Sequence, residues 1–295
     1  MTYPPGDWLP LAADASARRY FKGRYEGREA LLADFGGDAD GLDRFVSVRQ
    51  LLCDHDLPVP EIYGVDRGGS WLVQEFVSGR PLSRTRWAED LPGKLVDLAD
   101  KVAAIASWPE GPELLSLDEA RLRFELSFFR IHFLEGFLNL PAPEGLGEAL
   151  DRLAECVAAY PTVLAHRDFH SENLLEGADG RLVIVDFQDA LLAPRAYDAA
   201  SLAVDPYRPQ GDRLSRRFRD RWLEKNAGGT ALEFEQTALQ RALKALGTFG
   251  YQVTRRKKAR YMRFILPQAK RALELLPAGP LGIACLEPLL GSVNI

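Results

Sequence analysis

One eight-residue stretch constrains the chain more than any other. Residues 166–173 read His-Arg-Asp-Phe-His-Ser-Glu-Asn, which fits the pattern H-R-D-x-x-x-x-N, and Asp186-Phe187 follows thirteen residues after the Asn. Phosphoryl transfer needs a carboxylate that accepts the proton of the attacking hydroxyl, and oxygen ligands that hold Mg²⁺ on the phosphates. We therefore predict that Asp168 is a catalytic base and that Asn173 and Asp186 bind magnesium.

The segment between the two motifs has the composition of a β-hairpin. Apolar residues at 174–175 and 182–185 flank Gly-Ala-Asp-Gly at 177–180, which is typical of a tight turn. Such a hairpin would bring the catalytic loop (166–173) and the metal motif (186–190) together. The alternative is that the same side chains cap a turn, tie a loop and end a strand. The joint register of the motifs favours the catalytic interpretation.

The two histidines of the catalytic loop have an ordinary interpretation as well. A single histidine is commonly a hydrogen-bonded core residue, so we favour an architectural role for His166. For His170 both a structural and a functional role stay open. The three cysteines form no CxxC pair, and neither a disulfide framework nor a histidine–cysteine metal site is predicted.

The composition excludes several classes of protein. The chain has 295 residues, 46% of them hydrophobic, and a formal net charge of −5, so it lacks the basic character of a nucleic-acid binder. The sequence opens without a basic and apolar leader, and its most apolar late stretch, 275–290, is interrupted by proline and glutamate. We expect a cytoplasmic protein with no nucleic-acid or membrane partner, and a monomer by default.

The first 80 residues predict an antiparallel sheet with one helix. Short aromatic or β-branched runs, separated by Gly, Asp and Ser, lie at 8–12, 20–25, 29–34 and 71–76. Apolar residues at helical spacing between Gly41 and Cys53 predict one helix within this sheet. Helical patterns dominate from Ser83 onward. We predict an α+β fold of two lobes, with an N-terminal lobe at 1–78 and a mostly helical C-terminal lobe at 79–295.

A long helix is predicted near the middle of the chain. Ser116 opens an S-x-x-E capping box, and the apolar run 122–138 follows without proline. Arg121, Glu125 and His132 are spaced by four and seven, so they share one helix face and are candidates to line an acceptor pocket. The alternative is an intrahelical Arg–Glu pair beside a buried histidine. The phenylalanines of this run are expected in the core: Phe124, Phe128, Phe129 and Phe133.

The spacing after the metal motif favours a small acceptor. Eleven residues lie between Asp186 and Asp198, too few for the segment on which protein kinases dock a peptide. Residues 206–274 contain 17 Lys/Arg and 6 Asp/Glu, a net charge of +11, which disfavours a polycationic aminoglycoside and suits a neutral or carboxylate-bearing sugar. The alternative is that these charges coat solvated helix faces.

Over most of its length the chain resembles the protein-kinase-like small-molecule kinases, the aminoglycoside and choline kinase group. More narrowly, residues 166–175, 186–190 and 197–202 resemble the anomeric kinases that phosphorylate N-acetylmuramate and N-acetylglucosamine at C1 during peptidoglycan recycling. Softer matches lie at 14–21, around Glu125 and Phe129, and at 238–247. The resemblance implies a two-lobed fold with a nucleotide cleft, ATP and Mg²⁺ as cofactors, and a small-molecule sugar as substrate.

The resemblance also implies roles for further residues. Asp189 would complete a D-x-x-D pattern, and Asp198 would brace the catalytic loop, in which His166, Arg167 and His170 are supporting residues. A loop between the first two strands would cover the ATP phosphates, and the backbone of a hinge would meet adenine. The residues implied to contact ATP are Ser16, Arg18, Arg19, Lys22, Gln74, Glu75, Phe76 and Val77.

One departure from that group affects the phosphate site. Kinases of this fold usually carry a lysine on the third strand, and residues 29–34, Glu-Ala-Leu-Leu-Ala-Asp, contain none. Lys22, Arg18 or Arg19 would substitute, unless these are solvated strand residues. Three functions therefore compete: an ATP- and Mg²⁺-dependent sugar 1-kinase; a kinase of the same fold for an aminoglycoside, choline, homoserine or another metabolite; and a non-catalytic nucleotide-binding regulator.

Overall fold

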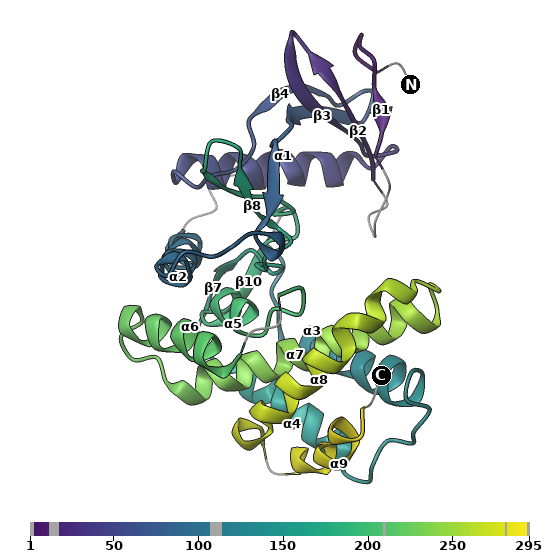
Figure 1. The fold of residues 1–295 in the computed structure, drawn as a ribbon, viewed down its shortest axis with the longest axis vertical. Helices are drawn as coiled ribbons and strands as arrows, with labels where there is room; N and C mark the ends of the chain where they lie inside the picture. Colours follow the sequence, from purple (N-terminus) through teal and green to yellow (C-terminus); the bar gives the residue numbers. More distant parts are fainter. Residues whose placement is uncertain (1–2, 12–17, 107–113, 209–210, 281, 294–295) are drawn as a thin grey trace. The chain divides into compact units, whose positions relative to one another are not determined.

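The computed structural model describes residues 3–11, 18–106, 114–208, 211–280 and 282–293. They pack as two compact units, each drawn from several parts of the chain (Figure 1). Of the described residues, those up to 86 and those at 172–190 belong to the sheet unit, and those at 87–106, 114–171 and from 191 onward belong to the helical unit. Asn173 and Asp186 therefore belong to the sheet unit and Asp168 to the helical unit. The lobe boundary after residue 78 stays a prediction.

The sheet unit contains the predicted antiparallel sheet and its helix. The strand order is β1-β2-β3-β5-β4, with every neighbouring pair antiparallel. The elements are β1 (Leu9–Pro10), β2 (Arg19–Tyr25), β3 (Arg28–Asp34), α1 (Ala39–Asp54), β4 (Ile62–Asp66) and β5 (Trp71–Glu75). Strand β4 was not predicted, because its residues are only half-buried and its register shifts near Gly64, which weakens the alternation on which strand prediction depends.

The predicted hairpin is confirmed as part of a second, three-stranded sheet in the same unit. Its order is β6-β8-β9, formed by β6 (Gly79–Pro81), β8 (Leu174–Gly177) and β9 (Leu182–Ile184), and the 3₁₀ turn η1 (Leu82–Arg84) follows β6. Gly180 occupies the hairpin turn with a φ of +80°, a conformation that glycine adopts without steric cost. The hairpin thus fixes the register between Asn173, which precedes it, and Asp186, which follows it.

The helical unit is built around one long buried helix, α7 (Ala231–Thr254). Helix α8 packs along α7 (Figure 1), and α3, α4 and α5 also contact it. A Cβ atom added at Gly247 would lie 2.6 Å from the backbone nitrogen of Phe129, so glycine permits this close backbone approach. The remaining elements are α2 (Leu91–Ala103), α3 (Glu119–Phe128), α4 (Leu146–Ala158), β7 (Thr162–Ala165), β10 (Leu191–Pro194), α5 (Tyr197–Ala203), α6 (Asp212–Lys225), η3 (Ala259–Tyr261), α8 (Met262–Leu275), η4 (Leu276–Ala278), η5 (Ile283–Leu286) and α9 (Glu287–Gly291).

The long helix predicted across 122–138 is wrong in two respects. Helix α3 ends at Phe128 and continues as the π-helical turn η2 (Phe129–Glu135). Its N-cap is Asp118, whose side chain accepts a hydrogen bond from the amide of Arg121 at 2.9 Å, and Ser116 instead forms a bridge to Leu192. Such π-turns shift the helix face by about one residue, so positions chosen on an α-helical wheel diverge beyond Phe128.

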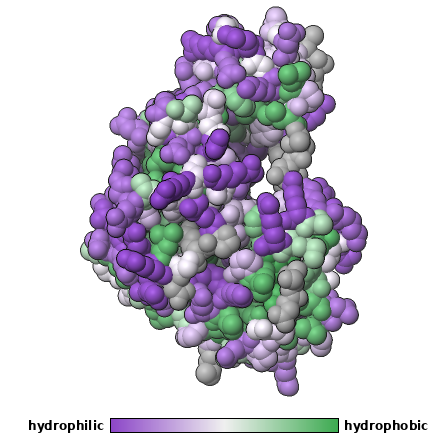
Figure 2. Space-filling view, in the orientation of Figure 1, coloured by the Kyte–Doolittle hydropathy of each residue, from purple (hydrophilic) through white to green (hydrophobic). Residues whose placement is uncertain are grey.

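The surface agrees with the composition. Figure 2 shows a largely hydrophilic face, with hydrophobic residues gathered over part of the helical unit. Phe124 is 65% exposed, against the expectation that it lies in the core, whereas Phe129 and Phe133 are fully buried. The three cysteines form no disulfide. In the described part of the chain, we find no helix with the length and hydropathy needed to span a bilayer.

Candidate active site

Two buried carboxylates hold the catalytic loop. Asp198, on α5, accepts hydrogen bonds from the backbone amides of His166 at 2.7 Å and Arg167 at 3.1 Å. Burial raises the pKa of Asp198, although the charge of His166 and the two amide donors act in the opposite direction. Asp205, just after α5, accepts from the amide of Ser171 at 2.8 Å. A loop outside regular structure leaves such amides unpaired, and these carboxylates satisfy them. These hydrogen bonds are consistent with the bracing role implied for Asp198. The similar contact made by Asp205 was not predicted from the sequence.

Both predicted motifs contain a residue with left-handed backbone, and the conformation is unusual at Arg167. Arg167 has a φ of +77° and Asp186 a φ of +62°, in the left-handed region that favours glycine. Side chains other than Gly, Asn and Asp rarely adopt this region, and when they do the site is often functional. Arg167, which immediately precedes Asp168, is such a residue.

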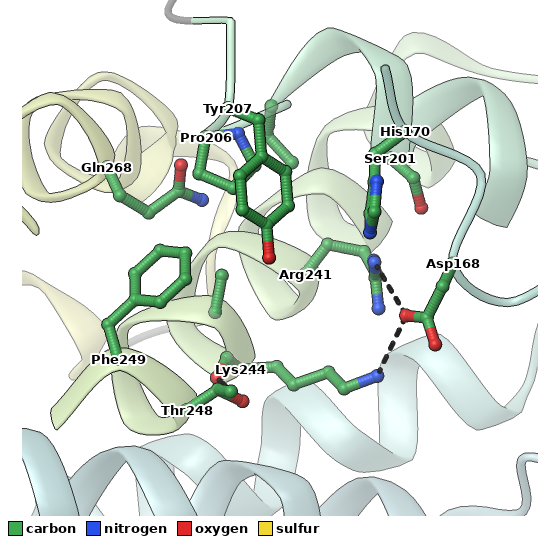
Figure 3. Close-up of a pocket in the computed structure, with 12 residues that line it drawn as sticks. Asp168, His170, Ser201, Pro206, Tyr207, Arg241, Lys244, Thr248, Phe249 and Gln268 are labelled. Atoms are coloured by element: carbon green, nitrogen blue, oxygen red, sulfur yellow. Dashed lines mark hydrogen bonds and ion pairs between the residues drawn. The ribbon is translucent and has the colours of Figure 1, made fainter. Parts of the chain in front are cut away.

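Asp168 lies among positive charges. Its Oδ1 is 3.6 Å from the guanidinium of Arg241 and 4.0 Å from Nζ of Lys244, both on α7 (Figure 3). Burial alone would raise the pKa of Asp168, but the charges of Lys244 and Arg241 outweigh it and hold that pKa well below its usual range. The side chain is 36% exposed. Asp168 is therefore an ionised carboxylate with access to a pocket, as a hydroxyl-orienting group must be.

Glu125 belongs to the same charge network. It lies 3.2 Å from Nζ of Lys244 and 3.4 Å from the guanidinium of Arg167, and it accepts a hydrogen bond from Gln240 at 2.9 Å. Burial would raise the pKa of Glu125, but Lys244 and Arg167 lower it further than burial raises it. The observed partners of Glu125 come from α7 and the catalytic loop, not from Arg121 one helical turn away.

The role of Arg121, Glu125 and His132 in an acceptor site stays a prediction. His132 packs against the rings of Phe128 and Tyr251, at centroid distances of 4.2 and 5.0 Å. Arg121, Glu125 and His132 are also absent from the described lining of the pocket beside Asp168. The π-turn after Phe128 accounts for the change of face at His132.

That pocket lies wholly within the helical unit and has a volume of about 80 Å³. Asp168 and His170 line it from the catalytic loop, Arg241 and Lys244 from α7, and Gln268 from α8 (Figure 3). The ring of His170 packs against Tyr207 at 4.8 Å, and burial lowers the pKa of His170 although Asp205 and Asp168 oppose this. His170 thus combines a packing role with a place in the pocket wall.

Two residues of this pocket were not predicted from the sequence. Arg241 is 8% exposed and donates to the hydroxyl of Tyr197 at 2.8 Å, and Lys244 bridges Asp168 and Glu125. The available signal was their position, because two cations three residues apart interrupt an otherwise apolar helical stretch. Charges are rarely buried unless they are paired, so such a pattern predicts acidic partners.

The predicted metal ligands lie together in the sheet unit. Nδ2 of Asn173 is 3.5 Å from Oδ2 of Asp186, and the backbone carbonyl of Asn173 accepts from Val185 at 3.0 Å. The amide of Gln188 lies between two carboxylates, 2.8 Å from Asp186 and 3.3 Å from Asp189. Amide and carboxylate oxygens are hard ligands that suit Mg²⁺, with phosphate and water completing its shell. No group of three or more His, Cys, Asp or Glu side chains arranged for a metal occurs in the part of the chain described.

An arginine of α1 forms hydrogen bonds with the metal motif, and this arginine was also not predicted from the sequence. Arg44 donates to the backbone carbonyls of Gln188 at 2.8 Å and Ala190 at 2.6 Å. The ring of Phe187 packs on Phe45 of the same helix at 4.9 Å. No sequence motif indicated this contact, because its acceptors are backbone atoms.

The cations considered for the phosphate site differ in what they contact. Arg19 pairs with the buried carboxylate of Asp34, and Arg18 lies over the ring of Phe35 at 5.0 Å. Lys22 lies 3.1 Å from Glu29 and 3.9 Å from the centroid of the Phe76 ring. Lys22 is therefore the cation that reaches the predicted hinge, while Ser16 lies outside the described residues.

The predicted hinge begins inside β5 and runs past its end. Gln74 is buried and Glu75 pairs with Arg181. The backbone amide of Phe76 donates to the carbonyl of Glu29 at 3.4 Å, and Val77 is half-buried. The adenine contact of this segment stays a prediction.

An antiparallel sheet unit that carries Asn173 and Asp186, followed by a mostly helical unit that carries Asp168, is typical of the protein-kinase-like phosphotransferase fold. A solved choline kinase from Streptococcus pneumoniae has this fold, with a TM-score of 0.63, 15% identity, and coverage of 90% of this chain and 92% of that one. Residues 7–235 match the phosphotransferase enzyme family. The chain belongs to this family.

Curated relatives extend over most of the chain. A Pseudomonas aeruginosa protein named N-acetylmuramate/N-acetylglucosamine kinase is 30% identical, over 98% of this chain and 89% of its own length. A Pseudomonas putida protein of the same name is 28% identical, over 88% of this chain and 80% of its own length. The resemblance stated from the motifs alone is therefore confirmed.

Proposed function

We propose that the protein is an ATP- and Mg²⁺-dependent kinase that phosphorylates N-acetylmuramate, N-acetylglucosamine or both at the anomeric hydroxyl. The observation that carries this proposal is the likeness to curated kinases of that name along nearly the whole chain. The ionised Asp168 beside a pocket for a small molecule supports it independently. The solved choline kinase shares the fold at 15% identity, which supports no particular acceptor.

In the proposed mechanism Asp168 orients the acceptor hydroxyl and takes its proton as the γ-phosphoryl group transfers in line. Asn173 and Asp186 would hold the magnesium ion, which supplies neutralisation of the phosphate charge when bound. Asp198 keeps the loop in place through the amides of His166 and Arg167. Most of the catalysis therefore comes from positioning and charge.

The charge around the pocket supports an acceptor without excess positive charge. Of the cations in residues 206–274, Arg241 and Lys244 line the pocket, whereas Arg219 and Arg221 form ion pairs elsewhere on the helical unit. Two cations next to the acceptor would repel an aminoglycoside and tolerate a neutral or anionic sugar.

The test is ADP release with Mg-ATP against N-acetylmuramate, N-acetylglucosamine, glucose, choline, homoserine and kanamycin, with Asp168→Asn as the blank. We expect activity on the N-acetyl sugars, and a product whose phosphate is at C1 by ³¹P NMR. Turnover of choline, homoserine or kanamycin alone would reject the sugar substrate and keep the phosphotransferase chemistry. If no acceptor causes ADP release while ATP still binds, the result would favour a nucleotide-binding regulator.

A further inference from the structure

The enclosed part of the pocket beside Asp168 is smaller than a sugar ring. Cavities of about 150 Å³ hold benzene, a ring of six heavy atoms, and this pocket measures about 80 Å³. It therefore accepts a substituent of three or four heavy atoms and leaves the ring that carries it outside. Because Asp168 is part of the wall, that substituent must be close to the reacting hydroxyl.

The walls of the pocket are chemically divided. Asp168, Arg241 and Lys244 make a charged side, and Figure 3 shows Gln268 and Phe249 on the opposite side, with the ring of Tyr207 between. Val204 and Ala245 add apolar atoms to the lining. A substituent that fills this space needs a small apolar end and a polar group.

Gln268 carries one of three buried polar atoms in the pocket lining that have no hydrogen-bond partner among the described residues; the other two are Nδ1 of His170 and Nε of Arg241. Its side chain is 2% exposed, and within the described residues its Nε2 atom has no hydrogen-bond partner. An unpaired buried amide is costly, on the order of 1–3 kcal/mol, so native proteins rarely keep one without a purpose. A carbonyl oxygen of a ligand would satisfy this donor.

We propose that this pocket is the subsite for an acetamido group next to the reacting hydroxyl, with Gln268 Nε2 donating to the acetyl carbonyl and the methyl group lying against Val204, Ala245 and Phe249. An acetyl group has three heavy atoms and the required pairing of one carbonyl with one methyl. The inference rests on the proposed function and deepens it, because it names the part of the substrate that is recognised.

The covalent structure of 2-acetamido sugars fits this arrangement. Their acetamido group is on C2, directly adjacent to the anomeric carbon, so a hydroxyl at Asp168 and an acyl group in the pocket belong to neighbouring ring positions. The lactyl ether of N-acetylmuramate is on C3, one position further away. The subsite therefore recognises what the two sugars share, and it discriminates against glucose, which has a hydroxyl at C2.

The experiment compares acyl chains on the wild-type enzyme and amide removal at Gln268. We expect kcat/KM to fall from N-acetyl- to N-butyrylglucosamine, because two more methylene groups exceed the pocket. In Gln268→Leu, kcat/KM for N-acetylglucosamine should fall by about ten- to a hundredfold, mainly through KM, while the KM for ATP stays unchanged. Gln252→Leu, the same substitution on α7 away from the pocket lining, is the matched control and should behave as wild type.

The outcomes separate the subsite from the function. If N-butyrylglucosamine is used as well as N-acetylglucosamine, or if Gln268→Leu matches Gln252→Leu, the acetamido subsite is overturned while the kinase assignment stands. A wild-type enzyme that phosphorylates neither N-acetyl sugar but another acceptor overturns the proposed function, and the subsite with it. The acyl-chain series needs no variant, so a Gln268→Leu protein that fails to fold leaves the proposal open to refutation.

Discussion

The two motif-bearing segments are held in place by opposite charges. In the helical unit the catalytic loop presents backbone amides, and the carboxylates of Asp198 and Asp205 accept from them. In the sheet unit the metal motif presents backbone carbonyls, and the guanidinium of Arg44 donates to two of them. Both segments lack regular hydrogen bonding, and each is satisfied by a side chain of the complementary kind.

The two segments also differ in what surrounds their own carboxylates. In the catalytic loop, burial would raise the pKa of Asp168, and the cations Lys244 and Arg241 lower it further than burial raises it. In the metal motif, Arg44 contacts only backbone carbonyls. The carboxylates of Asp186 and Asp189 accept hydrogen bonds from the side-chain amide of Gln188 and can also bind the proposed metal.

The largest expected effect is at the centre of the catalytic loop. Asp168→Asn should lower kcat by about 10²–10⁴-fold, the usual range for a general base, and leave the affinity for ATP nearly unchanged. Steady-state kinetics and nucleotide titration measure the two quantities. If the variant keeps most of its kcat, Asp168 is not the base, and the chemistry does not depend on this residue of the helical unit.

The second largest effect is expected at Asp198, the carboxylate that holds the catalytic loop. Asp198→Ala leaves two buried amides without an acceptor, so the free energy of unfolding should fall by about 2–4 kcal/mol, with a parallel loss of kcat. Urea unfolding measures the stability. Asp220→Ala, at an exposed carboxylate on α6, is the control and should change stability by less than about 0.5 kcal/mol. Equal effects of the two substitutions would contradict the bracing role.

The cationic brace should act on the metal motif instead. Arg44→Met removes two charge-assisted hydrogen bonds and keeps much of the aliphatic stem, so we expect a raised apparent KM for Mg²⁺ by about tenfold. The kcat at saturating Mg²⁺ and the KM for the acceptor should change little. A loss of kcat that high Mg²⁺ does not restore would show that the two braces serve the same step, and the contrast would fail.

The charge balance at Asp168 predicts a change in pH dependence. Lys244 is the largest of the charges that depress the pKa of Asp168, so Lys244→Met should raise this pKa. The base must be ionised, and the acidic limb of the kcat/KM profile should therefore move to higher pH. Lys244→Arg keeps the charge and is the control. If the acidic limb stays in place in Lys244→Met, the cations do not set the ionisation of Asp168.

The sequence predicted the side chains that carry the motifs better than it predicted their supports. The hairpin, the antiparallel sheet and helix α1 follow from local patterns of turn residues and apolar spacing, and all are present. The brace by Arg44 has backbone acceptors, which have no sequence signature. Asp205 accepts a hydrogen bond from the amide of Ser171, more than thirty residues away in sequence, and such pairing depends on tertiary structure.

The errors around α3 have a physical cause of the same kind. Apolar spacing cannot reveal a π-turn, because the insertion of one residue changes the face without changing the composition. The turn lies where Gly247 of α7 brings two backbones together, a tertiary contact. The acceptor role of Arg121, Glu125 and His132 stays a prediction. The residues that line the pocket beside Asp168 come from the catalytic loop, from residues 201–207, and from α7 and α8.

The smallest expected effect concerns the missing strand lysine. Residues 29–34 of β3 contain no cation, and Lys22 on β2 lies over the ring of Phe76 and beside Glu29. An exposed cation–π contact is worth about 0.5–1 kcal/mol, so Lys22→Met should raise the KM for ATP only a few-fold if Lys22 merely packs there. A loss beyond about a hundredfold would mean that Lys22 contacts phosphate directly, as a P-loop or strand lysine does. Arg24→Met on the same strand, whose guanidinium donates to the carbonyl of Gly27, is the control and should leave the KM for ATP unchanged.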